Sequence, residues 1–332
     1  MIKFAKPYLL ADYAEWLVLS ESRSEVSRGD LMMEGQLYQD LDIEGDVADH
    51  TATGTQQAKS TRLDTQLDDC FDHLQYRERA FGNGYLFLIK NDVLTARPDN
   101  AARGDEALVY RFLLACGRTG TKRLVPMAFS ELCKLALTRL IGPRGTVYNI
   151  DAGSDDRQHL GTDTRDMARL IASTLGCVVV KEHVDQLSGQ GDGGADLVAS
   201  ISFGDGATGH VSILGQCAAS EDETYWKNKL AQAKRLLALY TWSHDPIMAA
   251  FIPVLYRSGN GTWISQSNVY GSVLFDRLRI LNALQLSSMP LPPTLRDVLE
   301  RAVDEAEVIS KQPQGERAKR APKKGRAARK RA

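Results

Sequence analysis

The spacing of hydrophobic residues predicts a mostly helical first part of the chain, residues 1–150. Between residues 63 and 81, four apolar side chains recur at intervals of four, four and three residues, so they would share one face of a helix. They are Leu63, Leu67, Phe71 and Leu74. Three further helices are expected, over residues 9–22, 107–115 and 129–141. We therefore expect a mostly α N-terminal domain, in which we find no chemical motif.

From about residue 160 the pattern changes to short hydrophobic runs between helices. A helix over 163–175 is followed by the β-branched run 177–180, which is typical of a buried strand. Next come hairpin strands at 196–203 and 210–217, a helix at 222–240 begun by a capping box of Ser220 and Glu223, and a strand at 247–255. The order α-β-β-β-α-β predicts an α/β domain over residues 151–310, which helices after residue 271 would close.

Composition adds a charge asymmetry to this picture. The 332 residues are 43% hydrophobic and 25% charged, as in an ordinary globular protein with room for two domains. Of the 41 basic and 42 acidic residues, ten basic and one acidic lie in 311–332, which leaves the rest with a net charge of −10. This tail has no aromatic or large aliphatic residue, so we expect it to be disordered and to bind phosphate backbones. Its candidate nucleic-acid contacts are Lys319, Arg320, Lys323, Lys324, Arg326, Arg329, Lys330 and Arg331. Pairing of the tail with the acidic body is the alternative.

Several classes of protein are disfavoured by the sequence. The five cysteines are scattered without a Cys-x-x-Cys pair, which argues against a disulfide framework and a zinc knuckle. No apolar run approaches the ~18 to 20 residues that cross a bilayer, and Asp12 and Glu15 interrupt the N-terminal segment. We therefore expect a cytoplasmic protein without a membrane partner.

The informative stretch for chemistry is residues 191–220. Asp196 would begin one hairpin strand and Gln216 would end its partner, so an antiparallel pair would bring both side chains to one edge of the sheet. Mg²⁺ binds one or two carboxylates, carbonyl oxygens and waters. Asp196, the amide oxygen of Gln216 and the backbone carbonyl of Cys217 would thus form a site for Mg²⁺ or Mn²⁺. We expect the Asp196 carboxylate to serve the metal and not the packing of the strand.

The same stretch resembles a known superfamily. The string from Gly193 to Val198, followed by Leu214-Gly-Gln-Cys217, is similar to the core motif of PD-(D/E)XK nucleases, in the Gln-containing branch of Mrr-like restriction enzymes. Phe129-x-Glu131, Trp226-x-x-Lys-Leu and the segment 274–279 fit a looser relationship to antiviral-defence proteins. The resemblance implies a mixed-sheet, restriction-endonuclease-like core, with Asp196 and Gln216 as metal ligands.

One position departs from the family pattern. The family has a lysine two residues after the glutamine, but this chain has Ala218. The departure implies either an inactive relic or a lysine supplied from elsewhere, and the next helix offers Lys227 and Lys229. At ~100° per residue, Lys229 falls about 60° from Trp226 within the apolar face, whereas Lys227 falls about 100° away, outside it. A lysine on a packed face needs an anionic partner such as Asp196, so we expect Lys229 to be the catalytic lysine. Extension of its side chain along the helix to water is the alternative.

Other polar residues are weaker candidates. Asp192, Glu182 and Asp166 could support the metal site, although a turn or surface role also explains them. The glycine-rich approach could be a plain turn, and Gln216 a hydrogen-bonded core amide. Trp263, Arg277 and Arg279 suit contact with DNA or a partner, and packing explains them equally well.

These features lead to one principal functional hypothesis. The resemblance implies an Mg²⁺-dependent deoxyribonuclease, an effector in bacterial restriction or anti-phage defence. Its partners would be DNA and other defence proteins such as an ATPase, and a homo-oligomer is left open. A degenerate nucleic-acid-binding subunit without catalysis and a repair or recombination nuclease are the alternatives.

The basic tail generates the first test. Truncation after Ser310 should weaken DNA binding, because the ten cations of the tail release counterions from phosphates. The slope of log affinity against log salt concentration should become shallower, by up to ~0.9 for each phosphate that the tail no longer neutralises. Fluorescence anisotropy of labelled duplex DNA at several salt concentrations measures this slope. An unchanged slope would assign the tail to another partner.

Overall fold

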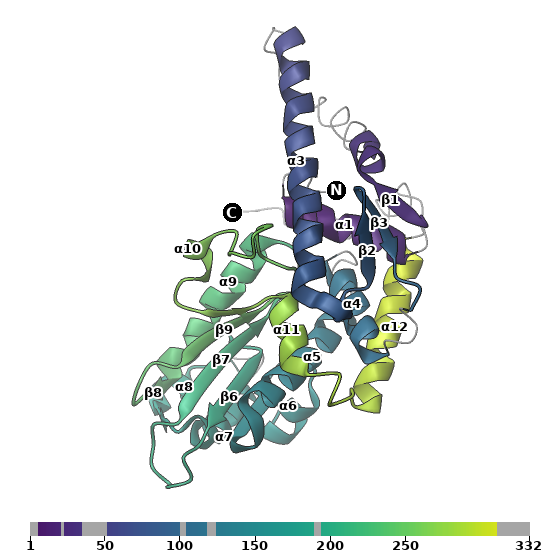
Figure 1. Cartoon of the computed structure of the whole chain (residues 1–332). Helices are drawn as coiled ribbons and strands as arrows, with labels where there is room; N and C mark the ends of the chain where they lie inside the picture. The colour runs from purple at the N-terminus through teal and green to yellow at the C-terminus, as the bar shows by residue number, and fades with distance from the viewer. Residues whose placement is uncertain are drawn as a thin grey trace, which may run out of the picture.

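The computed structural model describes residues 6–20, 23–34, 52–99, 104–117, 124–188 and 194–310, and these form an α/β fold (Figure 1). Its helices are α1 (Pro7–Leu19), α3 (Ala52–Phe81), α4 (Asp105–Cys116), α5 (Leu124–Ile141), α6 (Asp155–Leu160), α7 (Thr164–Leu175), α8 (Lys181–Asp185), α9 (Glu223–Ala233), α10 (Gln266–Val269), α11 (Arg277–Leu284) and α12 (Pro293–Ser310). Its strands are β1 (Glu25–Ser27), β2 (Phe87–Lys90), β3 (Val93–Ala96), β4 (Gly145–Asn149), β5 (Val178–Val179), β6 (Leu197–Ile201), β7 (Val211–Cys217), β8 (Tyr240–Thr241), β9 (Ile247–Phe251) and β10 (Val273–Phe275).

A mixed five-stranded sheet carries the second half of the fold. Its strand order is β10-β9-β7-β6-β4. Strand β6 runs antiparallel to both β4 and β7, whereas β7 and β9, and then β9 and β10, are parallel. In the β6–β7 pair, Leu197 lies opposite Gly215. The hairpin predicted from the glycine-rich turn is therefore confirmed, with its register fixed by the structure.

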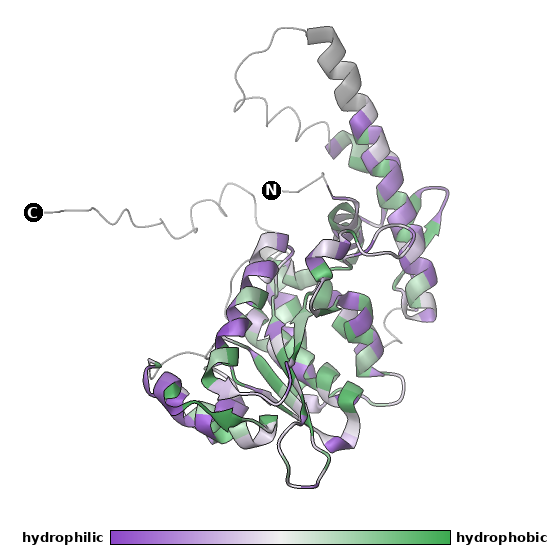
Figure 2. Ribbon diagram, turned by 90° about the vertical axis from the view of Figure 1, so that its left-hand side faces the viewer, coloured by the Kyte–Doolittle hydropathy of each residue, from purple (hydrophilic) through white to green (hydrophobic). Residues whose placement is uncertain are grey.

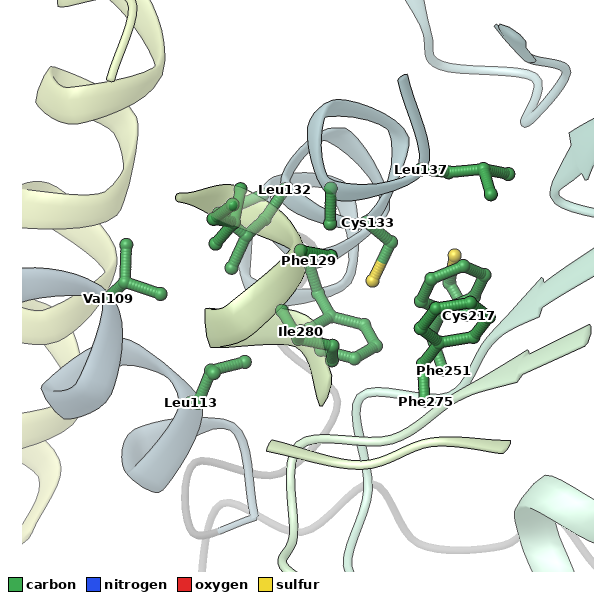
Figure 3. Close-up of a cluster of buried hydrophobic side chains, with 14 of the residues drawn as sticks. Val109, Leu113, Phe129, Leu132, Cys133, Leu137, Cys217, Phe251, Phe275 and Ile280 are labelled. Atoms are coloured by element: carbon green, nitrogen blue, oxygen red, sulfur yellow. The ribbon is translucent and has the colours of Figure 1, made fainter. Parts of the chain in front are cut away.

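Helices cover both faces of this sheet, so its strands are buried and hydrophobic (Figure 2). On one face, α5 contributes Phe129 and Cys133, which pack toward Cys217, Phe251 and Phe275 of the strands (Figure 3). On the other face, α7 contacts β6 and α9 contacts β7 and β9. The sheet is thus the middle layer of three, and α9 lies over the end of the β6–β7 hairpin.

The first strand of the sheet differs from the one that the sequence predicted. The run 177–180 forms β5, which pairs with β8 in a separate two-stranded sheet. Strand β4 pairs with β6 instead, and α6, α7, β5 and α8 lie between these two strands in the chain, so the predicted order α-β-β-β-α-β is not formed by consecutive elements. Strand β4 precedes residue 150 and pairs with β6 after it, so residues on both sides of position 150 share one sheet.

Helices α1 and α4 agree with their predicted spans to within three residues, whereas α5 begins five residues earlier than predicted and α3 begins at Ala52. They are accompanied by the small sheet β1-β3-β2. The predicted capping box was wrong, because the N-cap of α9 is Asp222, whose side chain accepts a hydrogen bond from the backbone N–H of Thr224. The predicted helix at 222–240 also ends earlier, at Ala233, where a short 3-10 helix follows. Among the described residues, no helix combines the length and apolar character that crossing a membrane requires.

A buried cluster of four charges joins the N-terminal helices to α11. Arg77 of α3 lies 2.6 Å from Asp12 and 2.7 Å from Glu15, both on α1, and its side chain is fully buried. Arg277 at the start of α11 reaches the same two carboxylates, at 2.8 and 3.4 Å. Arg277 is therefore a structural residue and not a DNA contact. Trp263 stacks against the guanidinium groups of Arg257 and Arg279, so packing explains it as well.

Candidate functional site

The ends of β6 and β7 bring the two principal predicted residues together. Asp196 directly precedes β6, and its backbone continues the ladder on both sides. The N–H of Ile150 donates to the carbonyl of Asp196 at 2.8 Å, and the N–H of Asp196 donates to the carbonyl of Gly215 at 3.0 Å. One step beyond the pair of Leu197 and Gly215, the register sets Asp196 opposite Gln216. The two residues therefore lie opposite each other at one edge of the sheet, as predicted, while their sharing of a cation stays a prediction.

The Asp196 carboxylate lies at the centre of a short hydrogen-bond network. Its Oδ2 accepts a bond of 2.6 Å from the backbone N–H of Cys217 and one of 2.7 Å from Nζ of Lys229. The same ammonium donates to the carbonyl oxygen of Cys217 at 2.9 Å. Lys229 therefore bridges the carboxylate and the backbone carbonyl that were predicted from the sequence to be metal ligands.

Helix α9 delivers this lysine in the orientation that its hydrophobic face predicted. The side chain of Lys229 is 21% exposed, against 43% for Lys227, which lies beside Glu223 and Asn268 on the outer face. Burial alone would lower the pKa of Lys229, but the charge and hydrogen bond of Asp196 outweigh it and raise that pKa above its usual value. The lysine is thus held as a cation beside Asp196.

Position 218, where the resemblance would place a lysine, holds an alanine in an apolar environment. Ala218 is 1% exposed, and it belongs to a hydrophobic cluster with Tyr8 and Leu9 of α1 and Trp226 of α9. A lysine side chain at this position would have to displace these apolar groups. Because Lys229 reaches Asp196 from α9, the cation at the site does not depend on position 218.

Gln216 has one satisfied and one unsatisfied side-chain atom. Its Nε2 donates to the carbonyl of Gly194, while the buried Oε1 has no hydrogen-bond partner among the described residues. Gly194 has φ +108°, and a Cβ there would lie 2.7 Å from the carbonyl oxygen of Gln232, so only glycine fits this approach. Buried polar atoms are nearly always paired, so the orphaned oxygen is a candidate ligand for a hard cation.

A cavity of about 200 Å³ opens beside Asp196 and Lys229. The described residues that line it include three carboxylates and one ammonium group. These are Asp151, Asp196, Asp222 and Lys229. The excess of negative charge favours a cation, and Tyr225 adds a polar aromatic group at the rim.

Asp151 is a site residue that the sequence reasoning missed. It follows the end of β4, and it was overlooked because that strand was not predicted. Behind it, Nδ2 of Asn149 donates to Glu131 of α5 at 2.6 Å. Burial raises the pKa of Glu131, and the hydrogen bond from Asn149 and the charge of Lys134 only partly oppose that effect. Glu131 of the Phe-x-Glu motif in α5 is thus connected to the site by its hydrogen bond with Asn149 of β4.

The other candidates do not gather at the cavity. Glu182 is exposed on α8, and Asp166 forms an ion pair with Arg169 on the surface of α7. Neither residue lines the cavity. Asp192 and the basic tail, residues 311–332, lie outside the described residues.

Within the described part of the chain, no three Asp, Glu, His or Cys side chains are grouped so that they could hold a metal. The candidate ligand set instead combines one carboxylate, one amide and one backbone carbonyl.

The expectation that Asp196 serves only a metal was wrong. Its carboxylate is 5% exposed, caps the N–H of Cys217 and neutralises Lys229, so it also stabilises the end of the sheet. Removal of a partner from a buried ion pair leaves an uncompensated charge, which costs free energy. Substitutions at this position must therefore keep the size and hydrogen-bonding capacity of the side chain.

Comparisons with models of known families, with curated proteins and with solved structures found no match. The geometry of the described residues therefore carries the functional argument.

A double-mutant cycle tests the ion pair. In metal-free buffer, Asp196→Asn and Lys229→Met should each lower the free energy of unfolding, because each leaves one buried charge without its partner. The double variant should lose less than the sum of the two single losses, by about 1–3 kcal/mol. Urea denaturation followed by circular dichroism measures the three differences. Additive losses would show that the pair contributes no coupling.

Proposed function

We propose that the chain is a metal-dependent DNA endonuclease of the PD-(D/E)XK type. The observation that carries this proposal is the position of Lys229. Its Nζ lies 2.7 Å from the carboxylate of Asp196 and 2.9 Å from the carbonyl of Cys217. A cationic donor, a carboxylate and a strand-end carbonyl are the groups that phosphodiester hydrolysis by such nucleases requires.

The arrangement of the elements supports the same proposal. Strands β4, β6 and β7 are followed by helix α9 and strand β9, although α6, α7, β5 and α8 are inserted between β4 and β6. The antiparallel second strand carries Asp196 at its start, and the third strand carries Gln216 near its end. The helix after the third strand then lies across this edge and supplies the lysine.

Asp196 and Cys217 line the cavity, and Gln216 is buried next to Cys217 without lining it, so these three residues are the candidate ligands for a divalent cation. Asp196, the orphaned Oε1 of Gln216 and the carbonyl of Cys217 would hold Mg²⁺ or Mn²⁺, and waters would complete the shell. When bound, the metal would supply Lewis-acid chemistry at the scissile phosphate. Lys229 would bind a non-bridging phosphate oxygen and stabilise the negative charge that develops there. The cavity beside these groups would admit the phosphate.

The cellular role rests on the resemblance alone. On this basis we propose DNA as the substrate and a part in restriction or anti-phage defence. A cytoplasmic location and an accompanying ATPase are proposed on the same basis. The alternative of an inactive relic was suggested by Ala218, which stands where the resemblance would place a lysine. Lys229 supplies a cation beside Asp196 from another position, so Ala218 no longer argues against activity, although the cation does not show that the chain is active. We therefore place the active nuclease before a degenerate binding subunit.

Plasmid cleavage tests the proposed function. The purified full chain should nick or cut supercoiled DNA in Mg²⁺ or Mn²⁺, and EDTA should stop the reaction. Asp196→Asn and Lys229→Gln should each lower the rate by about 10²- to 10³-fold, because each removes one charged group from the reacting centre. Initial rates from gel electrophoresis measure the effect.

Lys227→Gln is the matched control, because it removes the same charge from the exposed side of α9. Its cleavage rate should stay within about twofold of the wild type, as expected for a surface substitution. Metal-dependent cleavage that persists in both Asp196→Asn and Lys229→Gln would place the active site elsewhere. Absence of cleavage by the wild type on duplex and single-stranded DNA would favour the binding-subunit alternative.

A further inference from the structure

The ammonium of Lys229 occupies two of the three oxygen atoms that the proposed metal site would use. Nζ lies 2.7 Å from Oδ2 of Asp196 and 2.9 Å from the carbonyl oxygen of Cys217. Oε1 of Gln216 is the third oxygen, and it has no partner among the described residues. In this structure the lysine therefore acts as an internal cation at the metal position.

A divalent cation on these oxygens would lie close to the ammonium group and would be repelled by it. Two cations that bind the same carboxylate oxygen would lie within about 4 Å of each other, where like charges repel strongly in a partly buried site. The backbone of Lys229 is fixed in α9, but its side chain has four rotatable bonds and can withdraw its ammonium without moving the helix. The ammonium would therefore oppose metal binding unless the lysine side chain moved away.

The adjoining cavity provides space into which the ammonium group of Lys229 could move. It measures about 200 Å³, and Ser220, Asp222 and Tyr225 supply oxygen atoms along its wall beside Lys229. A phosphate that enters this cavity would attract the ammonium more strongly than these neutral or already hydrogen-bonded groups, because it presents several anionic oxygens. The substrate itself would then draw the lysine away from Asp196.

We infer that Lys229 and the divalent metal compete for Asp196 and Cys217, so that metal and nucleic acid bind cooperatively. The metal-free enzyme keeps its buried carboxylate neutralised by its own lysine. Phosphate engagement releases the carboxylate and carbonyl to the metal, and by linkage the bound metal raises the affinity for the phosphate by the same factor. The inference rests on the proposed function, because it needs the metal site to exist.

Calorimetric titration of Mn²⁺ into the full chain, without DNA, tests the competition. Lys229→Gln keeps a flexible, hydrogen-bonding side chain, one carbon shorter than lysine, but removes the charge, so it should bind Mn²⁺ at least about tenfold more tightly than the wild type. Lys229→Met serves as a second variant if the glutamine form does not fold, which thermal unfolding will show. Lys227→Gln removes an exposed charge from the same helix and should leave the affinity unchanged.

A second titration adds a short duplex with phosphorothioate linkages, which keep the phosphate charge. The duplex should raise the Mn²⁺ affinity of the wild type by a similar factor, after subtraction of Mn²⁺ binding to the duplex alone. It should leave the already tight affinity of Lys229→Gln nearly unchanged.

The outcomes separate the inference from the proposed function. Tighter Mn²⁺ binding by Lys229→Gln that is lost in Asp196→Asn supports the competition. Equal or weaker binding by both lysine variants, with binding still dependent on Asp196, overturns the competition and leaves the metal site in place. If no protein shows Mn²⁺ binding that depends on Asp196, with or without the duplex, then the metal site fails, and the inference fails with it.

Discussion

The carboxylate of Asp196 is buried at the end of the sheet, and a buried carboxylate must be met by a cation or by hydrogen-bond donors. Lys229 and the N–H of Cys217 provide both. This pairing requires α9 to lie across the ends of β6 and β7 at one angle. Trp226 maintains that angle, because it packs edge-on against Tyr256 one turn before the lysine.

The N-terminal helix also helps to hold α9 in place. Lys6, at the start of α1, forms a 2.7 Å ion pair with Glu223 in the first turn of α9. Tyr8 packs against Tyr256, which contacts Trp226 in turn. Further along α1, Asp12 and Glu15 enter the buried charge cluster with α3 and α11. The first helix of the chain therefore connects the buried charge cluster to the helix that carries Lys229, and its packing contributes to the geometry of the site.

Local sequence patterns predicted those parts of the fold and site that depend on local structure. The hairpin and the inward position of Lys229 followed from turn chemistry and helical periodicity, and the structure confirms both placements. Strand β4 was missed because five residues after a helix carry little signal, and Asp151 was missed with it. The β-branched run at 177–180 does form a strand, but pattern alone cannot specify its sheet partner. The bond from Cys217 to Asp196 requires three-dimensional geometry, so the structural role of that carboxylate could not be predicted.

We propose that Asp196, Gln216 and Cys217 form a metal site from which Lys229 withdraws. Anomalous scattering from crystals of the full chain, grown with Mn²⁺ and a DNA duplex, tests it most directly. We expect a manganese peak within coordination distance of Asp196, of Oε1 of Gln216 and of the Cys217 carbonyl, with the lysine ammonium turned toward a phosphate. Manganese bound only elsewhere, with Lys229 still on Asp196 in the presence of bound DNA, would contradict it.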